Sequence, residues 1–367
     1  MTAVWQKDFY AYLEWLKTHS ELGSSWAVGV SGGADSLALI FLLADWAKQS
    51  GIEIVALTVQ HGLRPEAEEE AQYVARLMQE HNIKHQILYW EGEKPTSGIE
   101  NAARQARYEL MHKWCVAQGV KSLLIAHHKR DQAETFLMRL QRGSGVDGLA
   151  AMAPISKWHD LLVVRPLLHV NPEDLREYLQ KKQIAWVEDS SNQCEDFLRV
   201  KIRNLLPELE NYIGLTRERI CNTALEMGRV RNYLEKQTSR FIAEQVRFCG
   251  ERVCRLNPEN LAELHEEIGL RVLSALLKKI GKLNYPPRME EVERLWEALH
   301  REDFKGCTLG GCEIFMFQKK LWIVSELKNK PVLKKTEWSD FVSEHPQFDT
   351  KFDLPYKARC VLYSLAR

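Results

Sequence analysis

The chain of 367 residues is long enough for two or three domains, and its apolar content of 45% is ordinary for a protein with a buried core. Fifty Lys and Arg residues balance fifty Asp and Glu residues, so any nucleic-acid-binding face must be a local patch. No apolar run approaches the roughly 20 residues of a membrane span, and the first residues lack the order of a signal peptide. The eight cysteines include no C-x-x-C pair and complete no zinc pattern, which indicates reduced thiols. We therefore expect a soluble, cytoplasmic protein.

The first predicted elements enclose a glycine-rich turn. In chain order they are an amphipathic helix within residues 2–22, a buried strand over 26–30, a turn over 31–33 and a helix from 35 or 36. Gly32 and Gly33 have no Cβ, so the backbone can bend sharply and let an anion approach closely. The free N–H groups of the following helix point into the same space. The turn is thus predicted to hold phosphate, and Asp35 beside it indicates a Mg²⁺ ion between carboxylate and phosphate.

The spacing of this turn excludes two common nucleotide loops, G-x-x-x-x-G-K-[ST] and G-x-G-x-x-G. The string from Ser31 to Ser36, Ser-Gly-Gly-Ala-Asp-Ser, instead resembles the SGGxDS loop of the PP-loop ATP pyrophosphatases. That resemblance implies cleavage of ATP between its α and β phosphates and adenylation of a substrate oxygen. The alternative is a helix-capping turn in which the glycines occur by chance.

Strands and helices alternate after this turn. Further strands are predicted over 53–59, 85–90, 122–128 and 161–167, and helices over 66–81, over 99–118 and from 131. This alternation predicts an α/β fold with a doubly wound, Rossmann-like parallel sheet. Ligands of such sheets bind beyond the carboxyl ends of the strands. The segments 31–36 and 127–134, together with His61 and Arg64, are therefore expected to meet in one crevice.

Two acids open the helix after the fourth predicted strand. Asp131 and Glu134 are three residues apart, so both carboxylates lie on one helical face. They either complement the helix dipole and cap the helix, or hold Mg²⁺ together with Asp35. The adjacent His127 and His128 would point to opposite faces of a strand, so we expect at most one to face the crevice.

A glycine-rich loop over 142–149 follows, and it is predicted to be a lid or a substrate cradle. The pattern of this block, HHxxDQxETxxxRxxRGxGxxGL, is similar to that of the tRNA(Ile)-lysidine synthetase family. Further blocks that resemble this family lie at 61–64, 100–108, 165–167 and 188–192. Two positions depart from the family pattern: Val200 replaces an asparagine, and Gln60 stands where some members carry aspartate or asparagine before the histidine.

The resemblance implies an ATP-dependent ligase. It would adenylate the C2 oxygen of the wobble cytidine in an isoleucine tRNA with the anticodon CAU, and free L-lysine would then displace AMP. The cofactors implied are ATP and Mg²⁺. The residues expected to act in catalysis are Asp35, Asp131, Glu134 and Arg203. Those expected to bind ATP are Ser31, Gly32, Gly33, Ala34, Asp35, Ser36, His61 and Arg64. Those expected to bind tRNA or lysine are Arg104, Arg107, His127, Arg139, Arg142 and Arg199. Those expected to bind Mg²⁺ are Asp35, Asp131 and Glu134.

Four segments are expected: a PP-loop catalytic domain over 1–210, a helical connector over 211–245, a small α+β domain that handles tRNA over 246–327, and a shortened C-terminal tail over 328–367. Between residues 199 and 240, nine Lys or Arg stand against five Glu. That surplus indicates contacts with a phosphate backbone, or else a solvated helix face neutralised by i,i+4 pairs. The sequence is also compatible with a homodimer.

Two other functions remain open. A PP-loop tRNA thiolase would need a sulfur carrier, and none of the crevice motifs contains a cysteine. A non-catalytic nucleotide sensor or RNA-binding module would not need three acids near the phosphates. We therefore favour the ligase.

Overall fold

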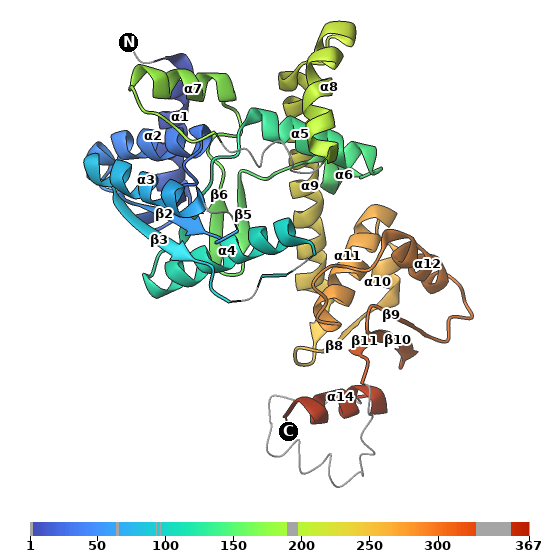
Figure 1. Ribbon diagram of the computed structural model, residues 1–367. Coiled ribbons are helices and arrows are strands. Elements are labelled where there is room, and N and C mark those ends of the chain that lie inside the picture. The colour runs from blue at the N-terminus through green and yellow to red at the C-terminus, as the bar shows by residue number, and fades with distance from the viewer. Residues whose placement is uncertain are drawn as a thin grey trace. The chain divides into compact units, whose positions relative to one another are not determined.

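The computed structural model describes residues 3–63, 66–92, 94–95, 97–188, 197–327 and 354–366. The chain divides into two compact units, residues 1–229 and 230–367 (Figure 1). The first unit holds the phosphate-binding turn and every residue expected in the crevice. The four segment boundaries predicted from the sequence stay a prediction.

Unit 1 is built on a six-stranded sheet with the strand order β3-β2-β1-β4-β6-β5. Its strands are β1 (Ser25–Gly29), β2 (Glu53–Gln60), β3 (Lys84–Tyr89), β4 (Ser122–Leu124), β5 (Ile155–Trp158) and β6 (Leu161–Val164). All neighbouring strands pair in parallel except β5 and β6, which pair antiparallel. The predicted doubly wound α/β sheet is confirmed, and the strand order reverses between β1 and β4. A crevice forms at such a reversal.

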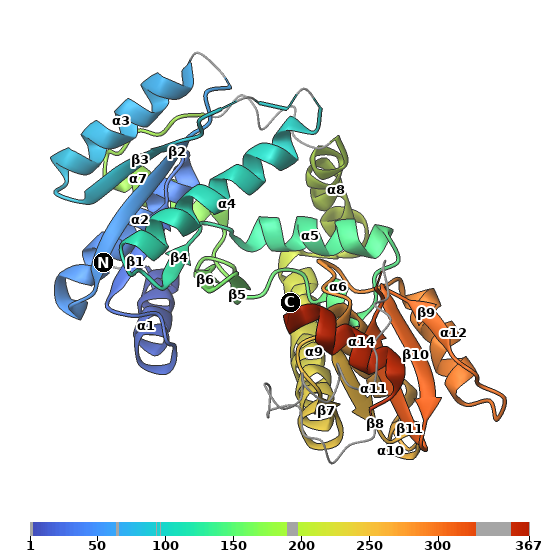
Figure 2. The same cartoon turned by 90° about the horizontal axis from the view of Figure 1, so that it is seen from below.

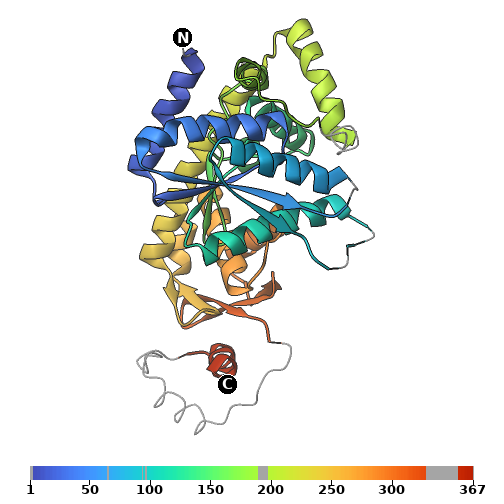
Figure 3. The same cartoon turned by 60° about the vertical axis from the view of Figure 1, so that its left-hand side comes forward.

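Helices cover both faces of this sheet, as Figure 3 shows with the blue helices on one side and the teal helix on the other. The helices of unit 1 that precede β6 are α1 (Val4–His19), α2 (Ala34–Ser50), α3 (Glu66–Glu80), α4 (Ile99–Ala117), α5 (Lys129–Gln141) and α6 (Val146–Leu149). Alternate residues of β1 explain the two layers. Trp26 and Val28 pack with α1, α2 and α3 in one core, whereas Ala27 packs with α4 in the other. The strand is therefore buried on both faces, as its continuous apolar run predicts.

Some predicted boundaries are wrong. The fourth strand ends at Leu124 and not at residue 128, so the two histidines lie in a connection between β4 and α5. Strand β5 and helix α7 (Pro172–Lys181) were not predicted. Residues 197–245 form two helices, α8 (Phe197–Ile213) and α9 (Arg217–Gln245). Gly214 separates them with φ of 66°, a left-handed conformation that glycine adopts without strain.

Unit 2 contains a five-stranded antiparallel sheet with the order β7-β8-β11-β10-β9. Its strands are β7 (Arg247–Phe248), β8 (Val253–Leu256), β9 (Cys307–Leu309), β10 (Cys312–Phe317) and β11 (Lys320–Ser325). Its further helices are α10 (Pro258–Ala262), α11 (Glu266–Ile280), α12 (Met289–Leu299) and α14 (Tyr356–Ala366). β10 and β11 form a hairpin, since they pair antiparallel across Gln318 and Lys319.

The two faces of the second sheet are covered by different helices. α11 and α12 share a core with inward residues such as Ile314 and Ile323. α14, red in Figure 2, covers the opposite face, where Trp322 and Val324 pack against Val361 and Leu362. Part of the segment that we expect to be a shortened tail, residues 328–353, lies outside the described residues. No helix within the described ranges is long and apolar enough to cross a membrane.

Candidate active site

The turn after β1 has the backbone that its glycines predict. Gly32 has φ of 86°, and a Cβ added there would lie 3.2 Å from Val74 Cγ2. Gly33 is the N-cap of α2 and has ordinary backbone angles, so no packing constraint of the protein explains its missing side chain. The Ser36 hydroxyl closes the turn, since its Oγ donates to the carbonyl of Gly33 at 3.0 Å and accepts from the Ser31 N–H at 3.1 Å. The turn is therefore fixed before any ligand binds, and Ala34 and Ser36 are both buried within it.

His128 joins this turn to the start of α5. Its Nε2 lies 3.3 Å from Asp35 Oδ2, and its Nδ1 lies 3.2 Å from Asp131 Oδ2. The side chain is only 3% exposed. Asp131 completes the N-terminal cap, because its Oδ2 also accepts from the His128 N–H at 3.0 Å. The predicted convergence of the β1 and β4 connections is thus confirmed, and a histidine between two carboxylates marks the meeting point.

Two protonation states of His128 fit these distances. The neutral ring would donate from Nε2 to Asp35 and accept at Nδ1 from the Asp131 N–H, 3.3 Å away. The imidazolium would donate to both carboxylates. Burial alone would lower the pKa of His128, but the hydrogen bond to Asp35 and the charges of Asp131 and Asp35 together raise it above its usual value. The flanking acids therefore favour the imidazolium.

Glu134 lies in an ion-pair cluster with two arginines of α8. Its side chain is fully buried. Its Oε2 accepts from Arg199 Nε at 2.6 Å and its Oε1 from Arg203 Nε at 2.9 Å. Arg199 also donates from Nη2 to Asp131 Oδ1 at 3.0 Å. Burial would raise the pKa of Asp131, but the charge and backbone N–H of His128 and the charge of Arg199 together lower it. The two arginines therefore fasten α8 to α5 through these acids.

This cluster bears on the expectation that three acids share one ion, which stays a prediction. Among the described residues, no three His, Cys, Asp or Glu side chains are grouped so that they could hold a metal. Both oxygens of Glu134 are occupied by arginine. Asp35 differs, because its Oδ1 is buried without a hydrogen-bond partner beside the glycine turn. An orphaned carboxylate oxygen next to a phosphate-binding turn fits a hard cation such as Mg²⁺, so Asp35 is the acid that suits the ion.

A second set of cations surrounds His127. Burial lowers the pKa of His127 to about 3; the charge of Asp131 opposes this, whereas Arg165, Arg104 and Arg107 lower the pKa further. Arg104 and Arg107 project from α4 and flank the Tyr108 ring. At neutral pH, His127 is therefore a neutral imidazole among arginines. Its predicted role in binding substrate stays a prediction.

Arg107 also acts on a second histidine, His61, which follows β2. Burial lowers the pKa of His61 to about 4, and the charges of Arg107 and Lys94 act in the same direction. Its Nδ1 is buried without a partner, as are His127 Nδ1, Arg130 Nε and Arg165 Nε. Together with Asp35 Oδ1, five such atoms lie on the elements that border this crevice. Buried polar groups are normally satisfied, so their concentration here indicates that ligand or water completes them.

The remaining predicted residues lie in three different settings. Arg139 donates from Nη1 to the carbonyls of Gly148 at 3.0 Å and Ala151 at 2.9 Å, so it fastens the loop that follows α5. Arg142 ends α5 and is exposed. Arg64 and residues 189–196, which include much of the block at 188–192, lie outside the described residues. The predicted roles of Arg139 and Arg142 toward tRNA or lysine, and of Arg64 toward ATP, stay predictions.

The basic surplus between residues 199 and 240 is largely paired. Arg217 lies 3.1 Å from Glu173, and Arg240 lies 2.9 Å from Glu244 in an i,i+4 pair. Arg231 lies 3.8 Å from Glu235 in another such pair. Arg231 and Arg240 thus have the i,i+4 pairs of a neutralised helix face, whereas Arg199, Arg203 and Arg217 pair with acids of other helices.

His128 was missed by sequence reasoning, which placed the functional histidine at 127. The usable signal was local. A capping residue followed three positions later by an acid is the pattern of a capping box, and His128 and Asp131 have that spacing. The charge of Arg165 lowers the pKa of His127, and that of Lys94 lowers the pKa of His61. Sequence spacing did not indicate either contact.

The fold and this turn place the chain in the class of PP-loop proteins, and residues 7–209 match the PP-loop domain family. Comparison with individual proteins identifies the family within this class. The chain is 38% identical to a tRNA(Ile)-lysidine synthase of Wolbachia pipientis wMel over 86% of its length and 75% of the relative. It is 40% identical to a tRNA(Ile)-lysidine synthase of Rhodopseudomonas palustris over 74% of its length and 79% of that relative. The chain belongs to the tRNA(Ile)-lysidine synthase family.

Among solved structures, the chain is similar to the U34-tRNA thiolase NcsA from Methanococcus maripaludis with its [4Fe-4S] cluster. The TM-score is 0.51 at 18% sequence identity, and the match covers 60% of this chain and 78% of the thiolase. At that identity the similarity concerns the fold alone.

Proposed function

We propose that the protein ligates free L-lysine to the wobble cytidine of an isoleucine tRNA with the anticodon CAU, in the cytoplasm and with ATP as the activating substrate. The cytidine O2 attacks the α-phosphorus of ATP and pyrophosphate leaves. The ε-amine of lysine then attacks C2, the C2–O bond breaks, AMP departs and the amine loses its proton. Membership of the family supports this reaction, and one structural observation carries it: His128 links the Asp35 turn to Asp131 where the strand order reverses.

The residues of the crevice divide the task. The N–H groups of the turn and of the first turn of α2 receive the phosphates of ATP. Asp35 would hold Mg²⁺ against them, and a bound ion of this kind neutralises the charge that pyrophosphate acquires as it leaves. The imidazolium of His128 holds Asp35 in place and adds positive charge behind the turn. Arg104 and Arg107 present guanidinium groups that suit the tRNA phosphates or the nucleotide base.

The cysteines favour this ligase over a PP-loop thiolase. Sulfur transfer requires a thiolate, which forms readily when a cationic or exposed setting lowers the thiol pKa. In unit 1, the cysteines within the described ranges are Cys115 and Cys221, and both are buried. Burial raises the pKa of Cys115 to about 12 and that of Cys221 to about 11. Neither thiol is suited to carry sulfur.

The test is mass analysis of the wobble nucleoside after incubation of the protein with ATP, lysine and the CAU tRNA. We expect the mass of lysidine, and an unmodified or thiolated cytidine would refute the proposal. Asp35→Ala should abolish pyrophosphate release that depends on tRNA, because the turn loses its only acid. Asp8→Ala, which removes an exposed acid from α1, is the matched control and should release pyrophosphate at the normal rate. Normal release by Asp35→Ala would remove Asp35 from the mechanism.

A further inference from the structure

Arg130 is a cation near the crevice whose Nε finds no partner in the protein. It is the second residue of α5, and its side chain is 20% exposed. Its Nε is buried and has no hydrogen-bond partner among the described residues. The acid that it approaches is Glu134, whose Oε1 lies 3.9 Å from Arg130 Nε, beyond hydrogen-bond distance. None of the roles assigned above to ATP, tRNA, lysine or Mg²⁺ uses this guanidinium.

Glu134 does not neutralise Arg130, because two other arginines occupy both of its oxygens. Arg203 Nε donates to Oε1 at 2.9 Å, and Arg199 Nε donates to Oε2 at 2.6 Å. Three guanidinium groups therefore approach one fully buried carboxylate. The second acid nearby, Asp131, pairs with Arg199 at 3.0 Å and is shared with a histidine. We call Arg130, Arg199 and Arg203 the arginine group, and it has a surplus of positive charge.

The position of Arg130 is unfavourable for a cation. Burial lowers the pKa of Arg130, and the charges of Arg203 and Arg176 act in the same direction. The charges of Glu134 and Asp35 act in the opposite direction. Arg130 also lies in the first turn of α5, where the helix dipole disfavours a cation. A charge that is opposed by burial, by neighbours and by the helix is typical of a ligand site, where stability is given up for binding.

The arginine group adjoins the phosphate-binding turn. Asp35 Oδ2 of the turn lies 3.3 Å from His128 Nε2, and His128 Nδ1 lies 3.2 Å from Asp131 Oδ2. The other oxygen of Asp131 lies 3.0 Å from Arg199. The charge of Asp35 also acts directly on Arg130. An anion that occupies the N–H groups of the turn and carries further charged groups would therefore reach Arg130.

The charge of the arginine group selects among the anions of the proposed reaction. Pyrophosphate carries several negative charges, and guanidinium groups bind phosphate oxygens through paired N–H donors. Free lysine fits less well, because its α-ammonium would approach the arginines together with its carboxylate. The β- and γ-phosphates of ATP are thus the best match for a site with surplus positive charge beside the turn.

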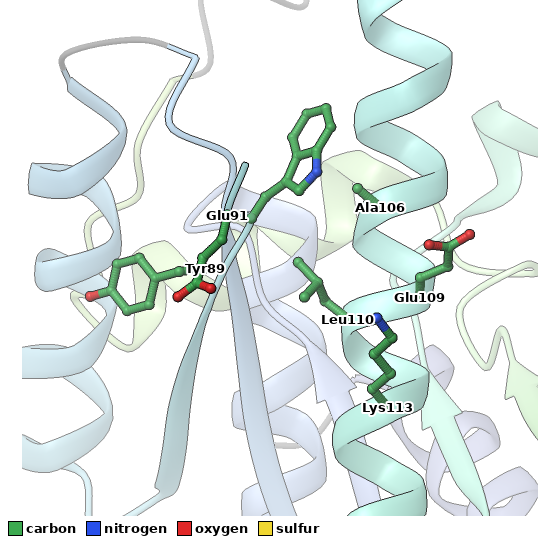
Figure 4. A pocket seen from close by; sticks show the side chains of 7 residues that line it. Tyr89, Glu91, Ala106, Glu109, Leu110 and Lys113 are labelled. Atoms are coloured by element: carbon green, nitrogen blue, oxygen red, sulfur yellow. The ribbon is translucent and has the colours of Figure 1, made fainter. Parts of the chain in front are cut away.

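The pocket of about 280 Å³ lined by residues of β3 and α4 is unsuited to such an anion (Figure 4). Its lining includes two carboxylates, Glu91 and Glu109, against the one ammonium of Lys113. In Figure 4 the two carboxylates point to different sides. Lys94, a further cation nearby, lies over the indole ring of Trp90, 4.4 Å from its centroid. The arginine group is therefore the more suitable place for phosphate.

We propose that Arg130 binds the pyrophosphate part of ATP and stabilises it as it leaves. The inference rests on the proposed function and adds a catalytic residue to the same reaction. As the cytidine O2 attacks the α-phosphorus, the bond from that phosphorus to the bridging oxygen breaks, and the oxygen keeps the electron pair. Arg130 donates hydrogen bonds to the oxygens of the departing group, where this charge accumulates. The guanidinium keeps its protons throughout.

Calorimetric titration separates this role from a structural one. Arg130→Gln should weaken binding of pyrophosphate and of ATP, each with Mg²⁺, about ten-fold, because a hydrogen bond between charged groups is lost. Binding of AMP, which lacks both phosphates, should stay unchanged. The melting temperature without ligand should equal or exceed that of the unmodified protein, because an unfavourable charge is removed. Arg76→Gln, which removes an exposed arginine from α3, is the matched control and should change none of these values.

Three results would overturn this role. Unchanged binding of pyrophosphate by Arg130→Gln would show that Arg130 does not touch the leaving group. An equal loss of AMP binding, or a lower melting temperature, would make Arg130 a structural residue. Weaker binding of tRNA without ATP, together with normal binding of pyrophosphate, would assign the arginine to an RNA phosphate.

Lysidine formation by the unmodified protein tests the proposed function separately. If lysidine forms and Arg130→Gln binds pyrophosphate normally, the role of Arg130 is wrong and the ligase stands. If no lysidine forms, the ligase fails, and the titration with pyrophosphate still decides whether Arg130 binds this anion.

Discussion

Replacement of Glu134 by glutamine tests the ion-pair cluster that fastens α8 to α5. Glu134 is fully buried and receives hydrogen bonds from Arg199 at 2.6 Å and Arg203 at 2.9 Å. Loss of one partner of a buried pair typically costs about 3–5 kcal/mol. The two arginine side chains are 29% and 34% exposed, so water recovers part of that free energy. We therefore expect Glu134→Gln to lower the free energy of unfolding of unit 1 by about 2–3 kcal/mol.

Calorimetry is the suitable assay, because two units need not unfold in one transition. For a unit of this size the expected loss corresponds to a fall in melting temperature of about 5–10 °C. Glu177→Gln is the matched control, because Glu177 forms an exposed i,i+4 pair with Lys181 and should change stability by less than about 0.5 kcal/mol. Adding Arg203→Met to Glu134→Gln should restore part of the loss, since the cation that pairs with Glu134 at 2.9 Å is then removed as well. A melting temperature of Glu134→Gln equal to that of the control would refute this account of the cluster.

Two further predictions concern the turn and its histidine. Gly32→Ala should destabilise the turn by about 1–2 kcal/mol, because φ of 86° disfavours a side chain. Gly33→Ala should leave stability unchanged and weaken only ATP binding. Urea unfolding measures the stability of each variant and titration with a non-hydrolysable ATP analogue measures its affinity; equal stabilities of the two variants would contradict the first expectation. His128 has a raised pKa, so the stability from its pairing is fully present below its unfolded pKa of about 6.5 and is lost as the pH rises through the folded pKa. The stability difference between the unmodified protein and His128→Asn should therefore be larger at about pH 5.5 than at about pH 9, and a difference that grows with pH would exclude the imidazolium.

The sheet was predictable because its strands carry a strong local signal. β1 and β2 are continuous apolar runs, and α3, which follows β2, has a clear amphipathic pattern. β5 gave no such signal, since Ile155–Trp158 contains a serine and a lysine and pairs at the edge of the sheet. Propensity also failed at the end of β4, where Ile125 and Ala126 continue the apolar run without continuing the strand. The chain leaves the sheet there to enter the cap of α5.

The site was predictable as far as each residue belonged to a local motif. Asp35 and Asp131 stand at helix starts after strands, and the rule for parallel sheets brought them together. The partners of Glu134 were not readable in this way. Arg199 and Arg203 lie 65 and 69 residues further along the chain, and only the packing of α8 on α5 selects them. An acid three residues after another acid looks like a metal ligand in the sequence, and the fold decides whether a metal or an arginine receives it.

The pairing of Glu134 with arginines changes the charge of the proposed active site. If Asp131 and Glu134 shared a magnesium ion with Asp35, the acids would supply most of the fixed charge near ATP. Instead, Arg199 and Arg203 neutralise the two acids of α5, and His128 lies between Asp131 and Asp35. Arg130, whose pKa burial lowers, adds another cation beside them. The crevice is thus electropositive through its own side chains, which suits a triphosphate and a tRNA backbone together. One acid with an orphaned oxygen, Asp35, would then suffice to hold the proposed Mg²⁺ ion.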